Sequence, residues 1–406
     1  MKIIQINTVC GHGSTGSIAV DIATGLRKKG DKCYIAYGQG SSNYSDSYKI
    51  GGWLENKWHG LFYSRILGLQ GYGTHRGTRQ LIQWIDHIQP DIIHLHNLQG
   101  NYLNHPLLFN YIIARQIPVV ITLHDCYNFT GKCSHYTAEG CYKWQTECRQ
   151  CPLLRKTIAP SYFLDRSRKI FLDKKRWYSQ IKKIAVVAVS KWLEHEAEKS
   201  ILAQNGHSIC HIYNWVDYRK FHRASQDEIQ TIYNKYGLNP QFKYLLSVGA
   251  GWDKKTSKYK DALNLSKLLP KGYKLLLVGG TSKGTVIESP IYHIPYVSDA
   301  HELSIIYSMA TAYIHLSVED TFGKVIAEAM ACGTPPIVFN STACPEVADK
   351  YGYIIPPHDV SAIIDLLPQL DISESQRCQM INHVRENFDY SKNIEQYIKL
   401  YESILQ

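Results

Sequence analysis

The sequence predicts an α/β protein of two domains, each a Rossmann-like parallel sheet whose strands are joined by helices. Short apolar runs of strand length alternate with stretches of helix length, and the alternation starts again in the second half of the chain. A length of 406 residues suits two or three domains. No apolar run approaches the ~20 residues that a membrane-spanning helix needs. The apolar start of the chain is too short for a secretory signal peptide, so we expect a cytoplasmic protein.

The chain opens with a βαβ pattern. Residues 2–10 and 32–37 have the length of strands, and residues 17–29 between them carry apolar side chains at every fourth position. The loop at 11–16 reads G-x-G-x-x-G, a dinucleotide-binding fingerprint that also requires an acid at the end of the second strand. That strand ends without an acid. An NAD-dependent oxidoreductase is therefore an alternative function, but the acid that would bind the ribose of the cofactor is missing.

Two later strands end in polar residues. Residues 90–97 close on His96 and Asn97, and residues 118–125 close on His124. Open α/β sheets bind ligands at the carboxyl ends of their strands. We therefore expect these side chains to lie at a binding site.

Four cysteines are spaced like the ligands of a structural metal. Cys133, Cys141, Cys148 and Cys151 close with a C-x-x-C, and four thiolates can surround a tetrahedral zinc ion. The insertion at 126–152 has few apolar residues of its own, so the metal would supply its fold. The odd total of 11 cysteines argues against a disulfide framework, and free reduced thiols are the alternative.

The positive charge is concentrated in the first half of the chain. Residues 1–207 contain 26 Lys and Arg against 14 Asp and Glu, whereas the remainder contains 19 against 21. This imbalance indicates an anionic partner, which could be nucleic acid, a membrane surface or a pyrophosphate-linked acceptor. Residues 53–69 combine bases with aromatic rings, and we interpret them as a core-packed helix or as a surface facing acceptor or membrane. A zinc-containing nucleic-acid-binding protein is a second alternative, although no RRM or helix-turn-helix signature is present.

The second half contains a strand–helix–strand unit flanked by two acids. Its strand candidates are residues 243–248, 274–278, 312–316, 336–339 and 353–355. Between the third and the fourth, Lys324 to Ala331 are good helix formers without proline. Gly333 stands where a left-handed residue ends a helix, and Pro335 forbids continuation. The helix N-terminus suits a diphosphate, with Asp320 and Glu328 placed to bind hydroxyl groups of a nucleotide.

The stretch from Asp320 to Glu328, followed by Ala-Cys-Gly-Thr-Pro, resembles the acid-x7-acid motif of retaining glycosyltransferases of family 4, which have the GT-B fold. That family usually has Glu at both ends, so Asp320 is one methylene shorter, and the adjacent Glu319 is a rival. The resemblance implies that Glu328 binds the ribose hydroxyls and that Asp320 binds hydroxyls of the donor sugar. The other donor-binding residues that it implies are Thr321, Phe322, Gly323, Lys324 and Val325, with the distal phosphate on the backbone of the last four.

The resemblance extends into the first half. It implies that the backbone at Gly13 approaches the donor diphosphate and that His124 lies beside the donor sugar. The phrase around His96 and Asn97 is similar to one in bacterial exopolysaccharide glycosyltransferases, which implies a role on the acceptor side. A subset of those enzymes also carries the phrase His-Asp-Cys…Gly-Lys-Cys…Gly-Cys…Trp…Cys-x-x-Cys-Pro, which supports zinc at the four cysteines.

The chain departs from the family pattern where the diphosphate is usually clamped. After Val248-Gly249 the family shows an arginine and then Lys-Gly, and this chain has neither at those positions. Lys254, Lys255 and Lys258 are the candidates to replace them, and we expect Lys258 to do so.

Together these features predict the GT-B fold, in which two Rossmann-like domains face each other across a cleft. We expect an acceptor-side domain at 1–207, a nucleotide-sugar domain at 208–384 and a helix at 385–406 that crosses back to the first. The implied reaction moves a hexose from a UDP- or GDP-sugar to a hydroxyl of a growing polysaccharide, with retention of configuration and no catalytic metal. The implied acceptor is an oligosaccharide or a polyprenyl-diphosphate-linked sugar, with peripheral contact at the inner face of the cell membrane and no nucleic acid.

Overall fold

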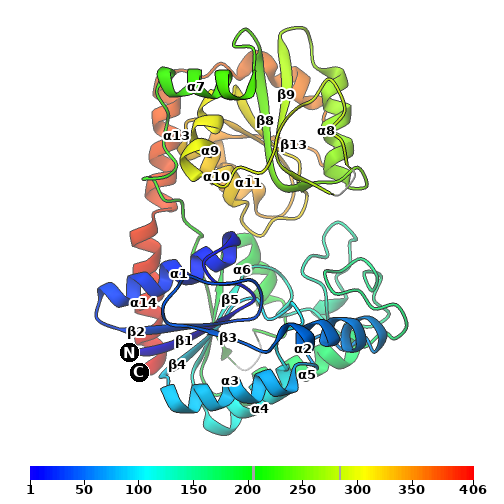
Figure 1. Cartoon of the computed structure of the whole chain (residues 1–406), viewed down its shortest axis with the longest axis vertical. Helices are drawn as coiled ribbons and strands as arrows, with labels where there is room; N and C mark the ends of the chain where they lie inside the picture. The colour runs from blue at the N-terminus through cyan, green and yellow to red at the C-terminus, as the bar shows by residue number, and fades with distance from the viewer. Residues whose placement is uncertain (204–205, 283–284) are drawn as a thin grey trace. The chain divides into compact units, whose positions relative to one another are not determined.

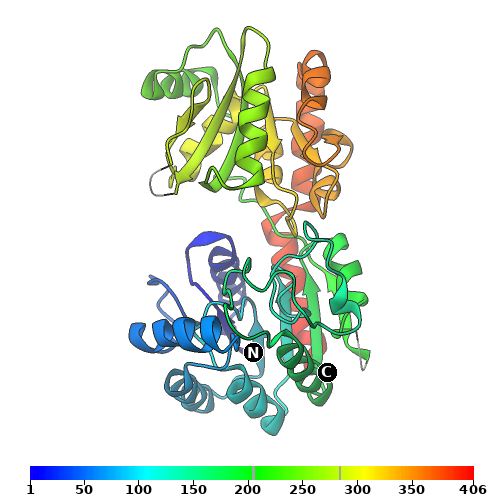
Figure 2. The same cartoon turned by 90° about the vertical axis from the view of Figure 1, so that its right-hand side faces the viewer.

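The computed structural model describes residues 1–203, 206–282 and 285–406 (Figures 1 and 2). The chain divides into two compact units. Unit 1 consists of residues 1–212 together with 391–406, and unit 2 consists of residues 213–390. Unit 1 is therefore discontinuous in sequence, because the end of the chain belongs to the same unit as its beginning.

Unit 1 is built on a seven-stranded parallel sheet in the order β3-β2-β1-β4-β5-β6-β7. Its strands are β1 (Lys2–Asn7), β2 (Lys32–Tyr37), β3 (Ser47–Lys49), β4 (Ile92–Leu95), β5 (Val119–Leu123), β6 (Ile184–Ala188) and β7 (Ser208–His211). The central strands are buried almost throughout, as expected of parallel strands that are covered on both faces. The strand order reverses between β1 and β4, so their carboxyl ends border the place where such sheets bind ligands.

Helices cover both faces of this sheet, with α1 and α14 on one face and α3, α4 and α5 on the other (Figure 1). The helices of unit 1 are α1 (Gly13–Lys28), α2 (Trp53–Trp58), α3 (His75–Ile88), α4 (His105–Arg115), α5 (Ser167–Gln180), α6 (Lys191–Glu198) and α14 (Tyr390–Leu405), with the π-helix η1 (His59–Ile66) and the 3-10 turn η2 (Lys143–Gln145). Two tyrosines of α14 reach the sheet: Tyr397 contacts Thr122 on β5, and Tyr401 contacts His94 on β4. The last helix therefore completes the core of unit 1.

Unit 2 contains a six-stranded parallel sheet in the order β10-β9-β8-β11-β12-β13. Its strands are β8 (Lys243–Trp252), β9 (Tyr273–Thr281), β10 (Tyr292–Ile294), β11 (Ala312–His315), β12 (Pro336–Phe339) and β13 (Tyr353–Ile355). Its helices are α7 (Gln226–Tyr236), α8 (Ser257–Leu268), α9 (Ala300–Met309), α10 (Lys324–Ala331), α11 (Cys344–Ala348), α12 (Ala362–Leu366) and α13 (Glu374–Asn387), with short 3-10 turns η4 (Asp349–Tyr351) and η5 (Leu367–Gln369). The order again reverses next to β8 and β11, which places the start of α10 at the binding edge of the sheet.

Three strands were not expected from the sequence. β3, β7 and β10 contain only three or four residues each, and all three lie at sheet edges. An edge strand has a partner on one side only and needs no long apolar run. Helix α1 also begins four residues earlier than expected, at Gly13, whose φ of 64° turns the chain from the loop into the helix.

The interpretation of residues 53–69 as a core-packed helix is wrong. The segment forms α2 followed directly by the π-helix η1, and Trp53 and Trp58 are 70% and 60% exposed. The buried side chains of the segment are instead His59 and Ser64. His59 Nδ1 lies 2.8 Å from Thr74 Oγ1, and its Nε2 accepts a hydrogen bond from a backbone N–H. Polar contacts thus help to hold this segment to unit 1, and five of its large apolar side chains are exposed: Trp53, Leu54, Trp58, Leu61 and Ile66.

Candidate functional site

The acid-x7-acid stretch lies between β11 and α10 of unit 2. Strand β11 ends at His315, and α10 begins at Lys324. Gly323 precedes the helix in the left-handed region, with φ of 77°, and an added Cβ would lie 2.7 Å from a side-chain carbon of Ile326. The helix stops before Gly333, whose φ of 78° confirms the predicted left-handed residue. The first N–H groups of α10 have no partners inside the helix, and they mark its positive end, which would stabilise an anion.

Glu328 is a buried acid on α10. Its carboxylate accepts a hydrogen bond from the Tyr307 hydroxyl at 3.4 Å and lies 4.0 Å from Lys324 Nζ. Burial raises the pKa of Glu328, and Lys324 and the Tyr307 hydrogen bond oppose this rise without cancelling it. A carboxylate can accept about four hydrogen bonds. Glu328 is therefore a costly buried charge with capacity left for the hydroxyl groups of a ligand.

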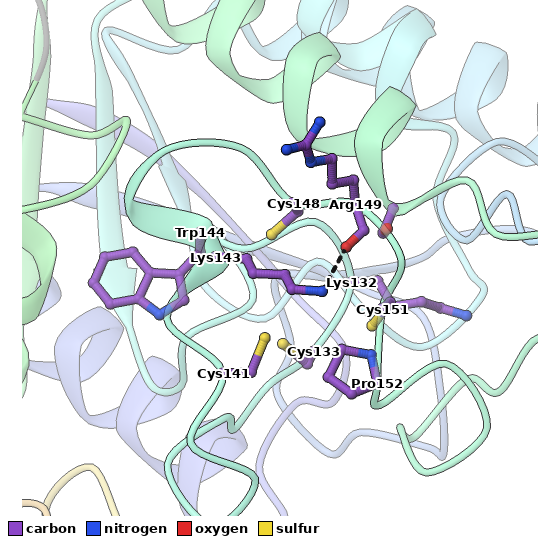
Figure 3. Close-up of a pocket in the computed structure, with 10 residues that line it drawn as sticks. Lys132, Cys133, Cys141, Lys143, Trp144, Cys148, Arg149, Cys151 and Pro152 are labelled. Atoms are coloured by element: carbon purple, nitrogen blue, oxygen red, sulfur yellow. Dashed lines mark hydrogen bonds between the residues drawn. The ribbon is translucent and has the colours of Figure 1, made fainter.

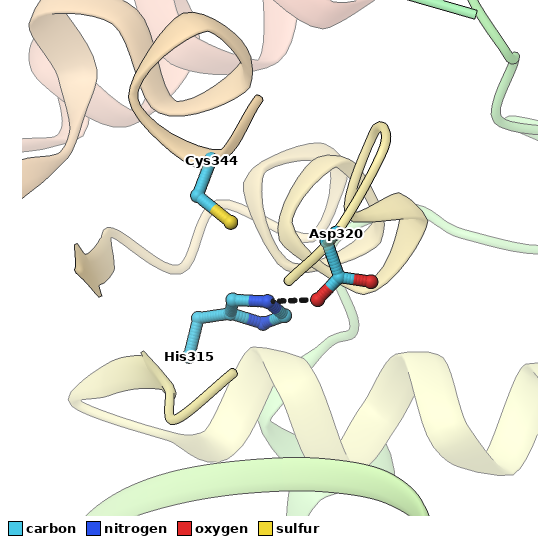
Figure 4. Close-up of side chains that lie close together, drawn as sticks. All are labelled: His315, Asp320 and Cys344. Atoms are coloured by element: carbon cyan, nitrogen blue, oxygen red, sulfur yellow. Dashed lines mark hydrogen bonds and ion pairs between the residues drawn. The ribbon is translucent and has the colours of Figure 1, made fainter. Parts of the chain in front are cut away.

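Asp320 is held by a buried histidine. Its Oδ2 lies 2.7 Å from His315 Nε2 (Figure 4). His315 Nδ1 lies 3.0 Å from the Tyr313 hydroxyl. Burial alone would lower the pKa of His315, but Tyr313, the Cys344 thiol and Asp320 together raise it well above its usual value. The backbone N–H of Asp320 donates to Thr342 Oγ1 at 3.1 Å. His315 thus orients the carboxylate of Asp320, and Thr342 holds the backbone of the same residue.

His315 and Asp320 form a compact group with Cys344, shown in Figure 4. One ligand atom from each lies within 4.8 Å of the others, and in the described ranges of the chain this is the one such group of three or more His, Cys, Asp or Glu residues. Imidazole, carboxylate and thiolate are all ligands of zinc. However, His315 Nε2 already forms a hydrogen bond with the acid, so a metal bound to that nitrogen would displace the contact that orients Asp320.

Three lysines could replace the phosphate clamp, and they differ in their surroundings. Lys255 is exposed. Lys254 is exposed and forms an ion pair with Glu288 at 2.6 Å. Lys258 is half-buried on α8, and its Nζ lies 4.8 Å from the centre of the Trp252 ring. Burial lowers the pKa of Lys258, and the nearby charge of Asp320 partly offsets this. Lys258 is therefore the lysine that unit 2 brings toward the acid-x7-acid stretch.

In unit 1, the strand-end histidines form a buried ladder. His94 and His96 are fully buried on β4 and just after it, and their ring centres lie 3.9 Å apart. The His96 and His124 rings stack at 5.1 Å, and His96 Nδ1 lies 2.9 Å from His124 Nε2. His124 is only partly buried, so it is the member of the ladder that reaches the end of the sheet. Sequence reasoning placed His96 on the acceptor side, whereas the structure places it behind His124.

Two other residues from the sequence lie in the same unit. A Cβ added at Gly13 would have no heavy atom within 4 Å, so the space beside its backbone is open. Asn97 follows β4, and its backbone carbonyl accepts hydrogen bonds from the Tyr102 hydroxyl at 2.7 Å and Thr8 Oγ1 at 3.0 Å. The loop after β4 is therefore held by side chains from its own unit.

The four cysteines Cys133, Cys141, Cys148 and Cys151 line one small cavity of about 10 Å³ (Figure 3). All 11 cysteines of the chain are free of disulfides. The sulfurs are not drawn together as closely as metal ligands, because they do not form a group within 4.8 Å among the described residues. Lys132 also lines the cavity, and its buried Nζ has no hydrogen-bond partner in the described part of the chain. The Gly131 N–H donates to Cys148 Sγ at 3.2 Å.

Sequence reasoning missed the residues that hold the candidate site residues in place. Tyr307, Tyr313 and His315 in unit 2, and Gln5 in unit 1, are buried polar residues that contact the predicted acids and histidines. One signal was present in the sequence: a single polar residue flanked by apolar residues in a run of strand length, as in Ile-His-Leu at 314–316 and Ile-Gln-Ile at 4–6. Such a residue must find a buried partner.

No helix in the described part of the chain combines the length and apolarity that a membrane crossing requires.

Two family descriptions match the chain. Glycosyltransferase Family 4 matches residues 15–220, and Glycosyl transferases group 1 matches residues 228–387. The chain is 20% identical to WcaC of Escherichia coli strain K12, which is named for glycosyl transfer in colanic acid biosynthesis, over the whole of both chains. It is 26% identical to the N-acetyl-alpha-D-glucosaminyl L-malate synthase of Bacillus anthracis over 54% of this chain and 60% of that protein.

Solved structures share the fold at low sequence identity. A glycosyltransferase from Rickettsia africae ESF-5 superposes with a TM-score of 0.71 at 15% identity, covering 100% of this chain and 98% of that one. HepE from Anabaena, in complex with UDP and glucose, gives a TM-score of 0.69 at 13% identity, covering 99% and 100%. With both domain types matched along the chain, the oxidoreductase and nucleic-acid-binding alternatives are dropped. The chain belongs to the glycosyltransferases of family 4 and has the GT-B fold.

Proposed function

We propose that this glycosyltransferase moves a hexose from a nucleotide sugar to a hydroxyl of an oligosaccharide or lipid-linked acceptor in polysaccharide biosynthesis, with retention of anomeric configuration. The observation that carries the proposal is the pair of acids around α10, one buried with its pKa raised and one fixed by His315. Two acids held in this way next to a helix N-terminus suit a ligand that has both hydroxyl groups and phosphates. The UDP and glucose bound to HepE and the polysaccharide role in the name of WcaC support the same reading.

Each site residue has a part in this proposal. Glu328 would bind the ribose hydroxyls, and Asp320 would bind hydroxyls of the donor sugar. The backbone from Phe322 to Val325 would face the distal phosphate, and Lys258 would neutralise part of its charge. His124 would border the sugar, and Gly13 would leave room for the diphosphate in unit 1.

The proposed reaction breaks the bond between the anomeric carbon and the diphosphate oxygen. A bond from the acceptor oxygen to the same carbon replaces it, on the face that the diphosphate leaves. The acceptor proton passes to the departing phosphate oxygen, which balances the charge. The helix dipole of α10 and Lys258 would stabilise the negative charge that develops on the diphosphate. We propose that these groups act without a catalytic metal, so turnover should need no added divalent cation.

A panel of UDP-, GDP-, ADP- and dTDP-sugars tests the donor class by thermal shift. The matching donor should raise Tm, and NMR of the product should show the anomeric configuration of the donor. An inverted product would refute retention, and stabilisation by none of these donors would refute the donor class. Added Zn²⁺ should inhibit turnover if it competes for His315 and Asp320.

We also propose that the four-cysteine set binds one structural zinc ion. The donor set is that of a structural zinc site, and four thiolates with zinc carry a net negative charge. Lys132 Nζ is buried beside the cavity and has no hydrogen-bond partner among the residues that the structure describes, which suits such a charge. The Gly131 N–H already donates to one sulfur. Zinc would draw the sulfurs together and fix a segment that consists mainly of loops.

The acceptor side is proposed to lie on α2 and η1. A cleft of about 540 Å³ there is lined by three bases, Lys49, Lys57 and Arg65. Beside it lies a rim of exposed apolar side chains that we call the aromatic rim: Trp53, Leu54, Trp58, Leu61, Ile66, Tyr162 and Phe163. Residues 162–163 join the rim because the Tyr162 N–H donates to the Arg65 carbonyl oxygen at 2.9 Å. Bases beside exposed tryptophans are typical of a surface that meets anionic lipid, so we propose peripheral contact with a membrane here.

A further inference from the structure

Gln5 sits behind the histidine ladder of unit 1, and its orientation is unambiguous. Its side-chain amide donates to the Ala19 carbonyl oxygen at 2.8 Å and to Cys33 Sγ at 3.2 Å. Its Oε1 lies 2.8 Å from His96 Nε2. Turning the amide over would set its oxygen against the carbonyl oxygen of Ala19, and neither atom can donate. Gln5 therefore presents an acceptor to His96.

The position of the proton on His96 follows from this acceptor. Because Gln5 Oε1 cannot donate, His96 Nε2 must carry the hydrogen. Burial lowers the pKa of His96 well below its usual value, so the ring is neutral and has only that one N–H. Its Nδ1 is then an acceptor, and the 2.9 Å contact to His124 requires that His124 Nε2 donate. Burial likewise lowers the pKa of His124 to about 4, so His124 is neutral near pH 7 and its Nδ1 carries no proton.

We propose that Gln5 and His96 are positioning residues that lock His124 in its Nε2–H tautomer, so that His124 offers an unprotonated Nδ1 as a hydrogen-bond acceptor. Resting on the proposed function, this means that the substrate group facing His124 is a hydroxyl, which can donate, and not a carboxylate or carbonyl. We call this chain of hydrogen bonds the relay: it runs from the Ala19 carbonyl on α1 through Gln5 and His96 to His124, at the carboxyl end of β5. Gln5 and His96 thereby decide which nitrogen of His124 is a hydrogen-bond acceptor, although neither residue is proposed to touch the substrate.

The groups facing the relay support a fixed tautomer. The His94 ring packs against His96 with the two ring planes tilted by 38°. His94 has its own partners, with Nδ1 2.7 Å from the Tyr401 hydroxyl and Nε2 2.8 Å from Thr122 Oγ1. The hydroxyls of Tyr397 and Tyr401, and the Cys33 thiol, face the ladder from α14 and β2. Burial raises the pKa of all three groups, so all are neutral near pH 7. No neighbour among these supplies a charge that would protonate the ladder.

The tautomer can be read without any activity assay. In the full-length protein labelled with ¹⁵N-histidine, long-range ¹H–¹⁵N spectra distinguish a protonated ring nitrogen from a bare one. Spectra of His96→Gln and His124→Gln variants assign the signals. We expect His96 and His124 to show protonated Nε2 and bare Nδ1 at pH 7. A protonated Nδ1 on His124 in the wild-type protein would overturn the proposal.

Gln5→Leu removes the anchoring acceptor, so His124 should then populate the Nδ1–H form. If the folded Gln5→Leu protein keeps the wild-type pattern on His124, Gln5 is not the anchor and the proposal fails. This readout needs no sugar, so its result stands apart from the proposed glycosyl transfer.

Steady-state kinetics of the glycosyl transfer provide a second test of the proposal. His96→Leu should lower kcat about tenfold, the scale of one lost hydrogen bond, with little change in KM for the donor. His96→Gln should restore most of kcat, because its amide can accept from His124 and donate to Gln5. His94→Gln is the matched control, being equally buried without a hydrogen bond to His124, and should change kcat much less. Equal losses in the His96→Leu, His96→Gln and His94→Gln variants would show that the ladder is only structural and would refute the positioning role.

Discussion

Replacing Glu328 with glutamine should weaken nucleotide binding and stabilise the empty protein at the same time. In the empty protein the carboxylate is buried, with one hydrogen bond from Tyr307 and a distant Lys324. Its pKa is raised by burial, which means that its charged form is destabilised by folding. Each unit of that rise corresponds to about 1.4 kcal/mol. A neutral Gln of the same shape removes this cost.

The raised pKa of Glu328 also determines how the stability difference between Glu328→Gln and the wild type changes with pH. A raised pKa of an acid in the folded state costs stability as pH rises from the usual Glu value through the raised value, because the unfolded chain loses its proton first. Glu328→Gln should therefore have a higher Tm than wild type at pH 7.5 without ligand, and the difference should vanish toward pH 4. Hydrogen bonds to a charged group contribute ~1.5–3 kcal/mol, so the Kd for the nucleoside diphosphate should rise by a factor of ~10–100 in Glu328→Gln, and further in Glu328→Ala.

Calorimetric titration of free UDP and GDP measures the first effect, and thermal unfolding across pH measures the second. Asp320→Asn is the matched control, since it removes the charge of the other acid, and its nucleotide Kd should change by no more than about twofold. An unchanged nucleotide affinity in Glu328→Gln would refute the ribose assignment. A lower Tm in the same variant would show that Glu328 is a structural acid and would refute the argument from burial.

Three further predictions follow from the same sites. Asp320→Ala should cost on the order of 10²-fold in kcat while nucleotide affinity persists, and His315→Gln should cost less, because Asp320 keeps its charge but loses its fixed orientation; a normal kcat in both variants would contradict the role of this pair. Metal analysis of protein purified without added metal should find about one zinc per chain. The zinc content should be unchanged in Cys126→Ser, because Cys126 is a nearby cysteine that is not among the residues lining the cavity, and a chain with freely titratable thiols and no zinc would exclude the site. Sedimentation with vesicles should show binding to anionic but not neutral lipid, weakened by replacing Trp53 and Trp58 with serine and by high salt; equal binding to both lipids would exclude the charged surface.

The sequence was most informative where local chemistry decides the structure. Helix α10 has the bounds that its helix formers, Gly333 and Pro335 predict, and β12 begins and ends where its apolar run does. Both elements are buried, and the residues that follow α10, such as Gly333 and Pro335, do not favour continuation of the helix. The acids were found because a helix N-terminus and a spacing of eight positions are properties of a short stretch of chain.

The rest of the candidate site depends on contacts between distant segments. Gln5 and His96 are 91 positions apart, and no pattern in either strand indicates that one orients the other. His315 lies only five residues from Asp320, yet its role depends on Tyr313 and on the backbone turn that brings Asp320 back to it. The exposed face of α2 and η1 was misread because its tryptophans have the composition of a core, and only tertiary structure shows that His59 is buried in their place.

The discontinuity of unit 1 has a consequence for how the protein is made. During synthesis, residues 1–212 emerge first, but α14 emerges only after all of unit 2. Until then, Thr122 and His94 lack the tyrosine hydroxyls that contact them in the finished core, and the apolar face under α14 is open to water. The N-terminal segment must therefore wait, incompletely packed, while 178 residues of unit 2 (213–390) are translated and fold. A nascent chain that stops short of Tyr397 would expose that face to chaperones and proteases. The contacts that complete the core of unit 1 can therefore form only after α14 has been translated.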